Sequence, residues 1–168
     1  IDIENKEGVD PEPVGKVKEF KHGDNVAKVN HRTTSNDFFE SVDSDKRWDI
    51  IFIDGMHEKH QVRIDIFNSL YHLAEKGTIV VHDIDPFHEA QLQKNKSYNV
   101  WEAWVELRRR DDIVMFATGA EMCGVIRKGK QEPFLPEADW KDWKLLEKQR
   151  EILLNPLQAE EFKKWAKA

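Results

Sequence analysis

The sequence has few of the features that mark secreted and membrane proteins. Its 168 residues include one cysteine, Cys123. No apolar run comes near the roughly 20 residues that a helix needs to cross a bilayer. A single cysteine excludes a disulfide within the chain and fits a reducing compartment. We therefore expect a cytoplasmic protein without a membrane partner.

Positive charges are outnumbered by negative ones. The chain has 26 lysines and arginines against 32 aspartates and glutamates, which gives a net charge of −6 at pH 7. Proteins that bind nucleic acid need a basic surface to neutralise phosphates, so we expect no nucleic-acid partner. The length fits a single domain with a real core, and neither an internal repeat nor a low-complexity segment is visible.

The clearest pattern is one strand–helix–strand unit over residues 48–86. Residues 50–53 form a short apolar run, typical of a strand buried on both faces. Apolar side chains three or four positions apart predict a helix over about 58–76, capped by Gly77. Residues 78–81 form a second, β-branched run. Two parallel strands joined by a helix end at the same sheet edge, which is where open α/β sheets bind ligands.

The remaining elements lie on either side of this unit. Before it we expect a short strand ending near Asp10, a weak strand over 26–29 and a short helix capped by Thr34 or Ser35. After it we expect an exposed polar loop beyond Pro86 and then a helix over 99–110 with a capping box of Asn99 and Glu102. A hairpin of strands 113–117 and 123–126 and a helical tail should follow.

This order of elements predicts a Rossmann-like α/β fold. Its mostly parallel sheet would end in a C-terminal antiparallel hairpin, followed by the helical tail. We expect residues 1–130 to form the α/β domain and residues 131–168 to form a helical extension packed on the same domain.

Four polar side chains, Asp54, His57, His82 and Asp83, follow the two central strands. Neighbouring strands lie about 4.8 Å apart, so Asp54 and Asp83 can share a hard cation such as Mg²⁺, which could hold and orient a substrate hydroxyl. His57 titrates near neutrality and suits the role of a base. Alternatively, Asp54-Gly55 is only a turn and His57 a solvated loop residue. Two acids and two histidines at adjacent strand ends favour a functional site.

Three further patterns leave alternatives open. His60 lies three residues after His57, so the two imidazoles could form a metal pair. Asp83-Ile84-Asp85 is a D-x-D sequence after an apolar strand, the arrangement that nucleotide-sugar glycosyltransferases use for a metal-bound diphosphate. Asp10 stands where an early strand delivers an acid to a ribose, although an Asp-Pro turn explains it equally well.

The strings DIIFIDGMH and GTIVVHDIDP, with the helix between them, resemble the class I S-adenosylmethionine-dependent methyltransferases. The closest branch is the small-molecule O-methyltransferases, which include metal-dependent sugar methyltransferases. The resemblance extends backward to GVDPEP and SNDFF and forward through VWEAW to CGVIRKG, over about residues 8–128. It implies S-adenosylmethionine as the cofactor and an enzyme that methylates a hydroxyl of a small molecule, with a sugar as one candidate.

The resemblance also implies roles for particular residues. Asp10 matches the acid that binds the cofactor ribose, and the segment from Ser35 to Asp37 matches the segment near adenine. Asp54 is expected to contribute to cofactor binding as well as to metal binding. Asp54 and Asp83 match metal-binding carboxylates, and His57 matches a general base.

One position departs from the family pattern. His82 stands where an acid often precedes the second metal aspartate, and an imidazole is a poorer Mg²⁺ ligand than a carboxylate. A metal-free site with His57 or His82 as the base therefore stays open.

The sequence also lacks the Gly-rich cofactor loop with which these enzymes begin. No strand, glycine loop and helix are visible before Asp10. The chain could be a fragment of a longer protein, a second chain could fill the gap, as in a homo-oligomer, or the first strands could rearrange. We expect a fragment, with weak or no cofactor binding by these residues alone. A rival hypothesis is a non-catalytic interaction module that kept the fold and lost the cofactor.

Overall fold

A computed structural model describes residues 5–11, 21–22, 25–26, 29–93, 96–118, 122–137 and 140–167 of the chain. The chain divides into two compact units, Ile1–Lys46 and Arg47–Ala168, and the described residues of each are treated separately. The division at residue 130 stays a prediction.

The first unit is small. Strands β1 (Lys21–His22) and β2 (Asn25–Val26) pair antiparallel, and α1 (Ser35–Ser41) follows. The predicted helix cap is confirmed at Thr34, whose hydroxyl accepts a hydrogen bond of 3.2 Å from the Asp37 amide. The strand predicted near Asp10 is reduced to a single parallel bridge between Val9 and His31. The weak strand predicted over 26–29 includes residues 27–28, which lie outside the described residues.

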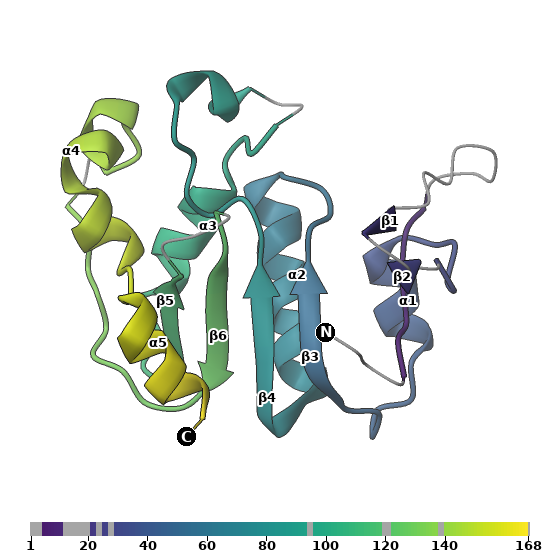
Figure 1. Cartoon of the computed structure of the whole chain (residues 1–168). Helices are drawn as coiled ribbons and strands as arrows, with labels where there is room; N and C mark the ends of the chain where they lie inside the picture. Colours follow the sequence, from purple (N-terminus) through teal and green to yellow (C-terminus); the bar gives the residue numbers. More distant parts are fainter. Residues whose placement is uncertain are drawn as a thin grey trace. The chain divides into compact units, whose positions relative to one another are not determined.

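The second unit contains a four-stranded sheet in the order β3-β4-β6-β5 (Figure 1). Strand β3 (Trp48–Ile53) pairs parallel with β4 (Leu73–Val81). Strand β6 (Gly124–Lys128) pairs antiparallel with both β4 and β5 (Ile113–Ala117). The Rossmann-like α/β fold, its central parallel pair and its C-terminal hairpin are therefore confirmed.

Helices cover the sheet on both faces. Helix α2 (Lys59–His72) connects β3 to β4, and it lies with α3 (Val100–Leu107) behind the sheet in Figure 1. A short 3₁₀ helix, η1 (Glu89–Leu92), precedes α3. Helices α4 (Trp143–Leu154) and α5 (Ala159–Ala166) form the predicted tail, and α5 crosses the opposite face at β5 and β6. None of the helices described is long and apolar enough to span a membrane.

Trp104 of α3 lies at the centre of the core. Its indole is fully buried, and its ring nitrogen donates a hydrogen bond of 3.1 Å to the carbonyl of Leu154, at the end of α4. A Cβ on Gly124 would come within 2.4 Å of the indole ring, so only glycine lets β6 approach so closely. Trp104 therefore joins α3, β6 and the helical tail into one core.

Helix α2 is shorter than predicted. It ends at His72 rather than near Lys76, because Leu73 is buried and already pairs with Trp48 of β3. Gly77 lies inside β4 and is not a helix cap. A Cβ there would come within 2.8 Å of the Leu73 side chain, so the glycine serves close packing instead.

The predicted capping box of α3 is also wrong. Asn99 does precede the helix, but its side chain makes no cap within α3. Its amide oxygen instead accepts a hydrogen bond of 2.7 Å from the Lys59 backbone N–H, in the first turn of α2. Glu58, the residue before α2, makes no side-chain cap, so Asn99 satisfies an amide that would otherwise lack an acceptor.

Candidate functional site

The candidate site lies at the edge where β3 and β4 end. Ile53 pairs with Val81 at the last rung of the ladder, and the His82 backbone N–H donates to the Ile53 carbonyl at 2.9 Å. Asp54 and His82 therefore leave the sheet side by side, and Asp83 follows in the same turn. His57 lies in the loop that leads from Asp54 into α2.

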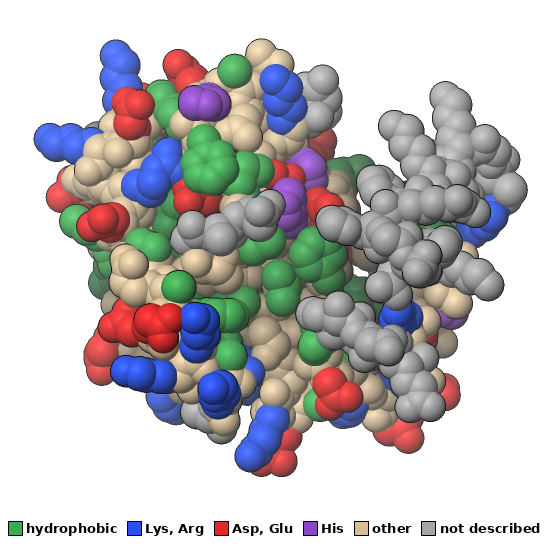
Figure 2. All heavy atoms as spheres, viewed as in Figure 1, with side chains coloured by type: hydrophobic (Ala, Val, Ile, Leu, Met, Phe, Trp, Pro, Cys, Tyr) green, Lys and Arg blue, Asp and Glu red, His purple; other side chains and the backbone are tan. Residues whose placement is uncertain are grey.

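Both imidazoles of this edge face both carboxylates. His57 Nε2 lies 3.5 Å from Asp54 Oδ1 and 3.1 Å from Asp83 Oδ2. His82 Nδ1 lies 3.5 Å from Asp54 Oδ1 and 3.3 Å from Asp83 Oδ2. Figure 2 shows histidine and acidic side chains gathered beside apolar ones near the upper ends of the strands. The structure thus brings together the four side chains that the strand ends predict. We call these four residues the edge cluster.

A second layer of contacts orients the edge cluster. The Ser97 hydroxyl donates a hydrogen bond of 2.8 Å to Asp83 Oδ1, and both side chains are buried. His57 Nδ1 contacts the Lys96 carbonyl, which can only accept, so Nδ1 carries a proton and Nε2 is the ring nitrogen that faces the carboxylates. The polar segment after Pro86 is therefore not simply an exposed loop, because its end packs against the site.

The pKa values of Asp54 and His57 reflect their mutual contact. The hydrogen bond with His57 lowers the pKa of Asp54 and outweighs the opposing effect of partial burial. The hydrogen bond with Asp54 raises the pKa of His57, and the Lys96 carbonyl and the charge of Asp83 act in the same direction. The protonated imidazole of His57 is thus stabilised at this edge.

The electrostatics of the edge cluster call for a positive charge at its centre. His82 Nδ1 is buried and makes no hydrogen bond within the described residues, although it faces two carboxylate oxygens. Among those residues, ligand atoms of Asp54, His57 and Asp83 all lie within 4.8 Å of one another. Because the Nδ1 proton of His57 is directed at the Lys96 carbonyl, a neutral His57 would point its Nε2 lone pair at these oxygens, and a proton or a cation between them removes the repulsion.

The remaining cofactor residues that the resemblance implies are described within the first unit. Asp10, Ser35 and Asp37 belong to the first unit, where the Asp10 amide donates to the His31 carbonyl at 3.0 Å and Asp37 accepts from the Thr34 hydroxyl at 2.7 Å. Their cofactor roles stay predictions. His60 is exposed in the first turn of α2 and is not one of the converging donors.

Two residues of this region were missed in the sequence. Ser97 is one of several small polar residues between η1 and α3, and no spacing marks it. Arg150 of α4 donates from one guanidinium nitrogen to the Asp85 carboxylate and, at 2.8 Å, to the Pro86 carbonyl. It is 65 residues from Asp85 in sequence, so no local pattern could have found it.

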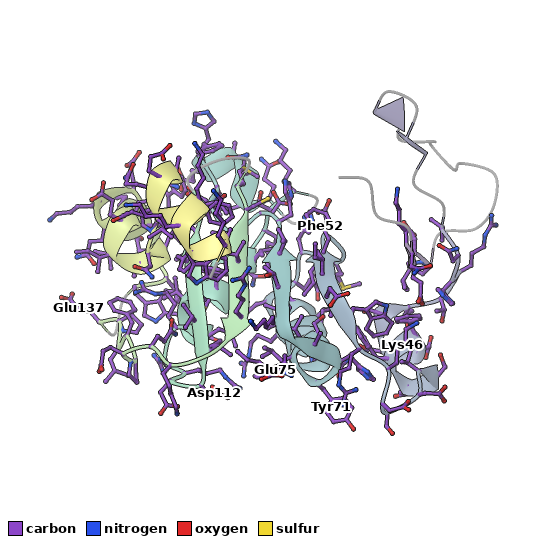
Figure 3. The ribbon with its side chains drawn as sticks, turned by 60° about the horizontal axis from the view of Figure 1, so that its bottom comes forward. Lys46, Phe52, Tyr71, Glu75, Asp112 and Glu137 are labelled. Carbon is purple, nitrogen blue, oxygen red and sulfur yellow. The ribbon has the colours of Figure 1, made fainter. Side chains whose placement is uncertain are left out.

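A separate cavity lies at the opposite end of the sheet. It has a volume of about 390 Å³, and its lining includes Tyr71 and Asp112, which are labelled in Figure 3. Strand β5 begins at this end, whereas β3 and β4 end at the edge cluster. This cavity is therefore not part of the candidate site.

The sequence matches the family model of a methyltransferase domain over residues 4–84. The matched segment contains both strands of the parallel pair and ends just after Asp83. This match supports a class I S-adenosylmethionine-dependent methyltransferase family for the matched residues. A search of the curated proteins finds no match to this sequence. The edge cluster lies at the carboxyl ends of the parallel strands, which is where open α/β sheets bind ligands.

Proposed function

We propose that this protein transfers the methyl group of S-adenosylmethionine to a hydroxyl of a small molecule, for which a sugar is one candidate. The observation that carries the proposal is the convergence of Asp54, His57 and Asp83 at the ligand edge of a methyltransferase domain. A hydroxyl must lose its proton to become a good nucleophile, and this cluster supplies a base where a substrate would lie. The acidic net charge favours a small molecule over nucleic acid.

In this proposal the hydroxyl oxygen attacks the methyl carbon in line with the carbon–sulfur bond. That bond breaks with its electron pair going to sulfur, which leaves S-adenosylhomocysteine. His57 Nε2 takes the hydroxyl proton, while the Lys96 carbonyl holds the ring orientation through Nδ1. Asp54 and Asp83 stabilise the imidazolium that forms. Positioning of the two reactants supplies much of the acceleration.

A divalent cation could occupy the same edge. Mg²⁺ prefers a shell of oxygen ligands, and two of the four facing donors here are imidazole nitrogens, so Mg²⁺ fits the edge cluster poorly. Zn²⁺ or Co²⁺ fits a mixed set of two carboxylates and two imidazoles. Asp54, His57, His82 and Asp83 would hold it, and it would supply a Lewis acid for the hydroxyl.

Two other functions are supported less well. In the D-x-D sequence of a glycosyltransferase both carboxylates serve the metal–diphosphate, whereas Asp85 is held in an ion pair by Arg150. A non-catalytic interaction module has no need of a buried Asp83 whose two oxygens are engaged by Ser97 and by two histidines.

The pH dependence of methyl transfer tests the proposed base. His57 must be neutral to accept a proton, so kcat/KM should rise with pH through the pKa of His57, above its ordinary value of about 6.5. Asp54→Asn removes the main interaction that raises this pKa, so the rising limb should move to lower pH. An NMR titration of the His57 ring measures the same shift without an acceptor. An unchanged His57 pKa in the Asp54→Asn variant would rule out the electrostatic pairing.

Cation binding can be measured by thermal unfolding in the presence of Zn²⁺, Co²⁺ or Mg²⁺. We expect Co²⁺ at about 100 times its Kd to add roughly 2–3 kcal/mol to the unfolding free energy, and Mg²⁺ at the same concentration to add much less. Protons compete for His57, so the Co²⁺ effect should shrink as the pH falls through its raised pKa. Asp83→Asn should remove the effect. Equal stabilisation by Mg²⁺, or an effect that survives the Asp83→Asn substitution, would contradict this binding site.

A further inference from the structure

The turn that carries Asp83 adopts a backbone conformation that contacts with other parts of the chain must stabilise. Asp83 has a φ of 62°, in the left-handed region that side chains other than glycine rarely adopt. This conformation directs Oδ2 toward His57 and His82 and Oδ1 toward Ser97. The position of the carboxylate therefore depends on whatever fixes the residues on both sides of it.

The chain before Asp83 is fixed by the sheet, and the chain after it by three contacts. The Ile84 amide donates to the Met122 carbonyl at 3.0 Å, and the Ile84 side chain is fully buried. Beyond it, Arg150 donates both to the Asp85 carboxylate and to the Pro86 carbonyl. One guanidinium therefore binds a side chain and a backbone carbonyl of the same turn.

The position of Arg150 is fixed by the packing of helix α4 against the core. Helix α4 bends at Gln149, whose φ and ψ of −118° and 23° are not helical, and Leu146 and Leu153 on either side of the bend are buried. The Arg150 guanidinium lies 5.8 Å from the centre of the Trp143 ring. The far end of α4 is tied down, because Arg108 donates to the Leu153 carbonyl at 2.9 Å.

The ion pair is shielded from water. The side chains of Asp85 and Arg150 are 16% and 27% exposed. Removing either partner leaves the other charge partly buried without its counter-ion. This costs more free energy than breaking an ion pair that is exposed to solvent. The turn would then shift to solvate the remaining charge, and Asp83 lies two residues away.

We propose that Arg150 is a positioning residue for Asp83 and acts through the Asp85–Pro86 end of the turn. The two carboxylates of Asp83-Ile84-Asp85 then have different roles. Asp83 faces the edge cluster, whereas Asp85 anchors the turn to the C-terminal helix α4. The part of this inference that concerns activity rests on the proposed methyl transfer, but the part that concerns the turn does not.

Hydrogen exchange measured by NMR tests the turn directly. In Arg150→Met we expect the Ile84 amide to exchange at least about tenfold faster, the factor that loss of a charge-assisted hydrogen bond implies. The Ile126 amide in β6 should keep its wild-type rate. Asp85→Asn breaks the same pair from the other side and should give the same local change. Arg109→Met removes an exposed arginine at the end of α3 and should change neither amide.

Activity then tests whether Arg150 acts through Asp83. Arg150→Met should lower kcat for methyl transfer at least about tenfold in the wild-type background. It should lower kcat no further once Asp83 is replaced by alanine, because the group it positions is then gone.

Two results of the exchange experiment would overturn the inference: unchanged Ile84 exchange in both the Arg150→Met and Asp85→Asn variants, or equally faster exchange at Ile84 and Ile126. A further fall of kcat when Arg150→Met is added to Asp83→Ala would overturn it as well. If the full-length wild-type protein transfers no methyl group, the proposed function fails, while the exchange experiment still decides the role of Arg150 in the turn.

Discussion

Replacing His57 by glutamine is expected to lower the rate of methyl transfer by about 10²- to 10⁴-fold, the range for loss of a general base. Glutamine is close to histidine in size and can still donate to the Lys96 carbonyl, but its amide cannot take up a proton. The two carboxylates that face His57 Nε2 at 3.1 and 3.5 Å would lose the imidazolium that they stabilise. Steady-state kinetics with S-adenosylmethionine and a hydroxylated acceptor measure the loss.

His60→Gln is the matched control for this substitution. His60 lies three residues further along, in the first turn of α2, and it is exposed and outside the edge cluster. We expect wild-type kinetics from this variant. If both glutamine variants lost activity equally, or if the variant at position 57 kept it, His57 would not be the base.

Trp104→Ala is expected to lower the free energy of unfolding by about 3–5 kcal/mol, the usual cost of removing a large buried aromatic side chain. The indole is fully buried, and its ring nitrogen holds the end of α4 through the Leu154 carbonyl. The cavity would open against Gly124, which has no side chain to fill it. Urea unfolding followed by circular dichroism measures the change.

Ile152→Ala serves as the control for the core. Ile152 is also a large apolar residue close to the end of α4, but it is 59% exposed. Its loss should change the unfolding free energy by no more than about 0.5 kcal/mol. A comparable loss in the two variants would mean that Trp104 does not join the tail to the sheet.

Much of the fold could be predicted from the sequence because its strongest signals are local. The apolar run before Asp54 and the β-branched run before His82 identify two strands, and they end at a shared edge because strands joined by a helix run parallel. The four members of the edge cluster could therefore be named before their distances were known. The hairpin of β5 and β6 is equally local, since its two strands lie only a few residues apart in the sequence.

The features that could not be predicted depend on contacts between distant residues. Helix α2 ends at His72 because Leu73 pairs with Trp48, and nothing in the helical pattern itself shows this. Asn99 caps a helix 40 residues before it rather than its own. Arg150 reaches the turn after β4 only because α4 packs on the core. In each case packing between elements overrides the local preference.

Two imidazoles at the edge cluster also change what the family resemblance implies. A site with carboxylates alone would suit Mg²⁺, whereas His57 and His82 favour either a proton or a softer cation at the same place. Both possibilities place positive charge between Asp54 and Asp83, which is where the proposed function places the substrate hydroxyl.

The most direct test of the central claim identifies the atom that receives the methyl group. The full-length wild-type protein is incubated with ¹³C-methyl-labelled S-adenosylmethionine and a set of sugars and other hydroxylated small molecules, and the products are read in a ¹H–¹³C NMR spectrum. The account predicts a methyl ether from at least one acceptor, and no such signal from the His57→Gln variant. A labelled methyl group on nitrogen or sulfur, or no transfer to any acceptor in the set, would contradict it.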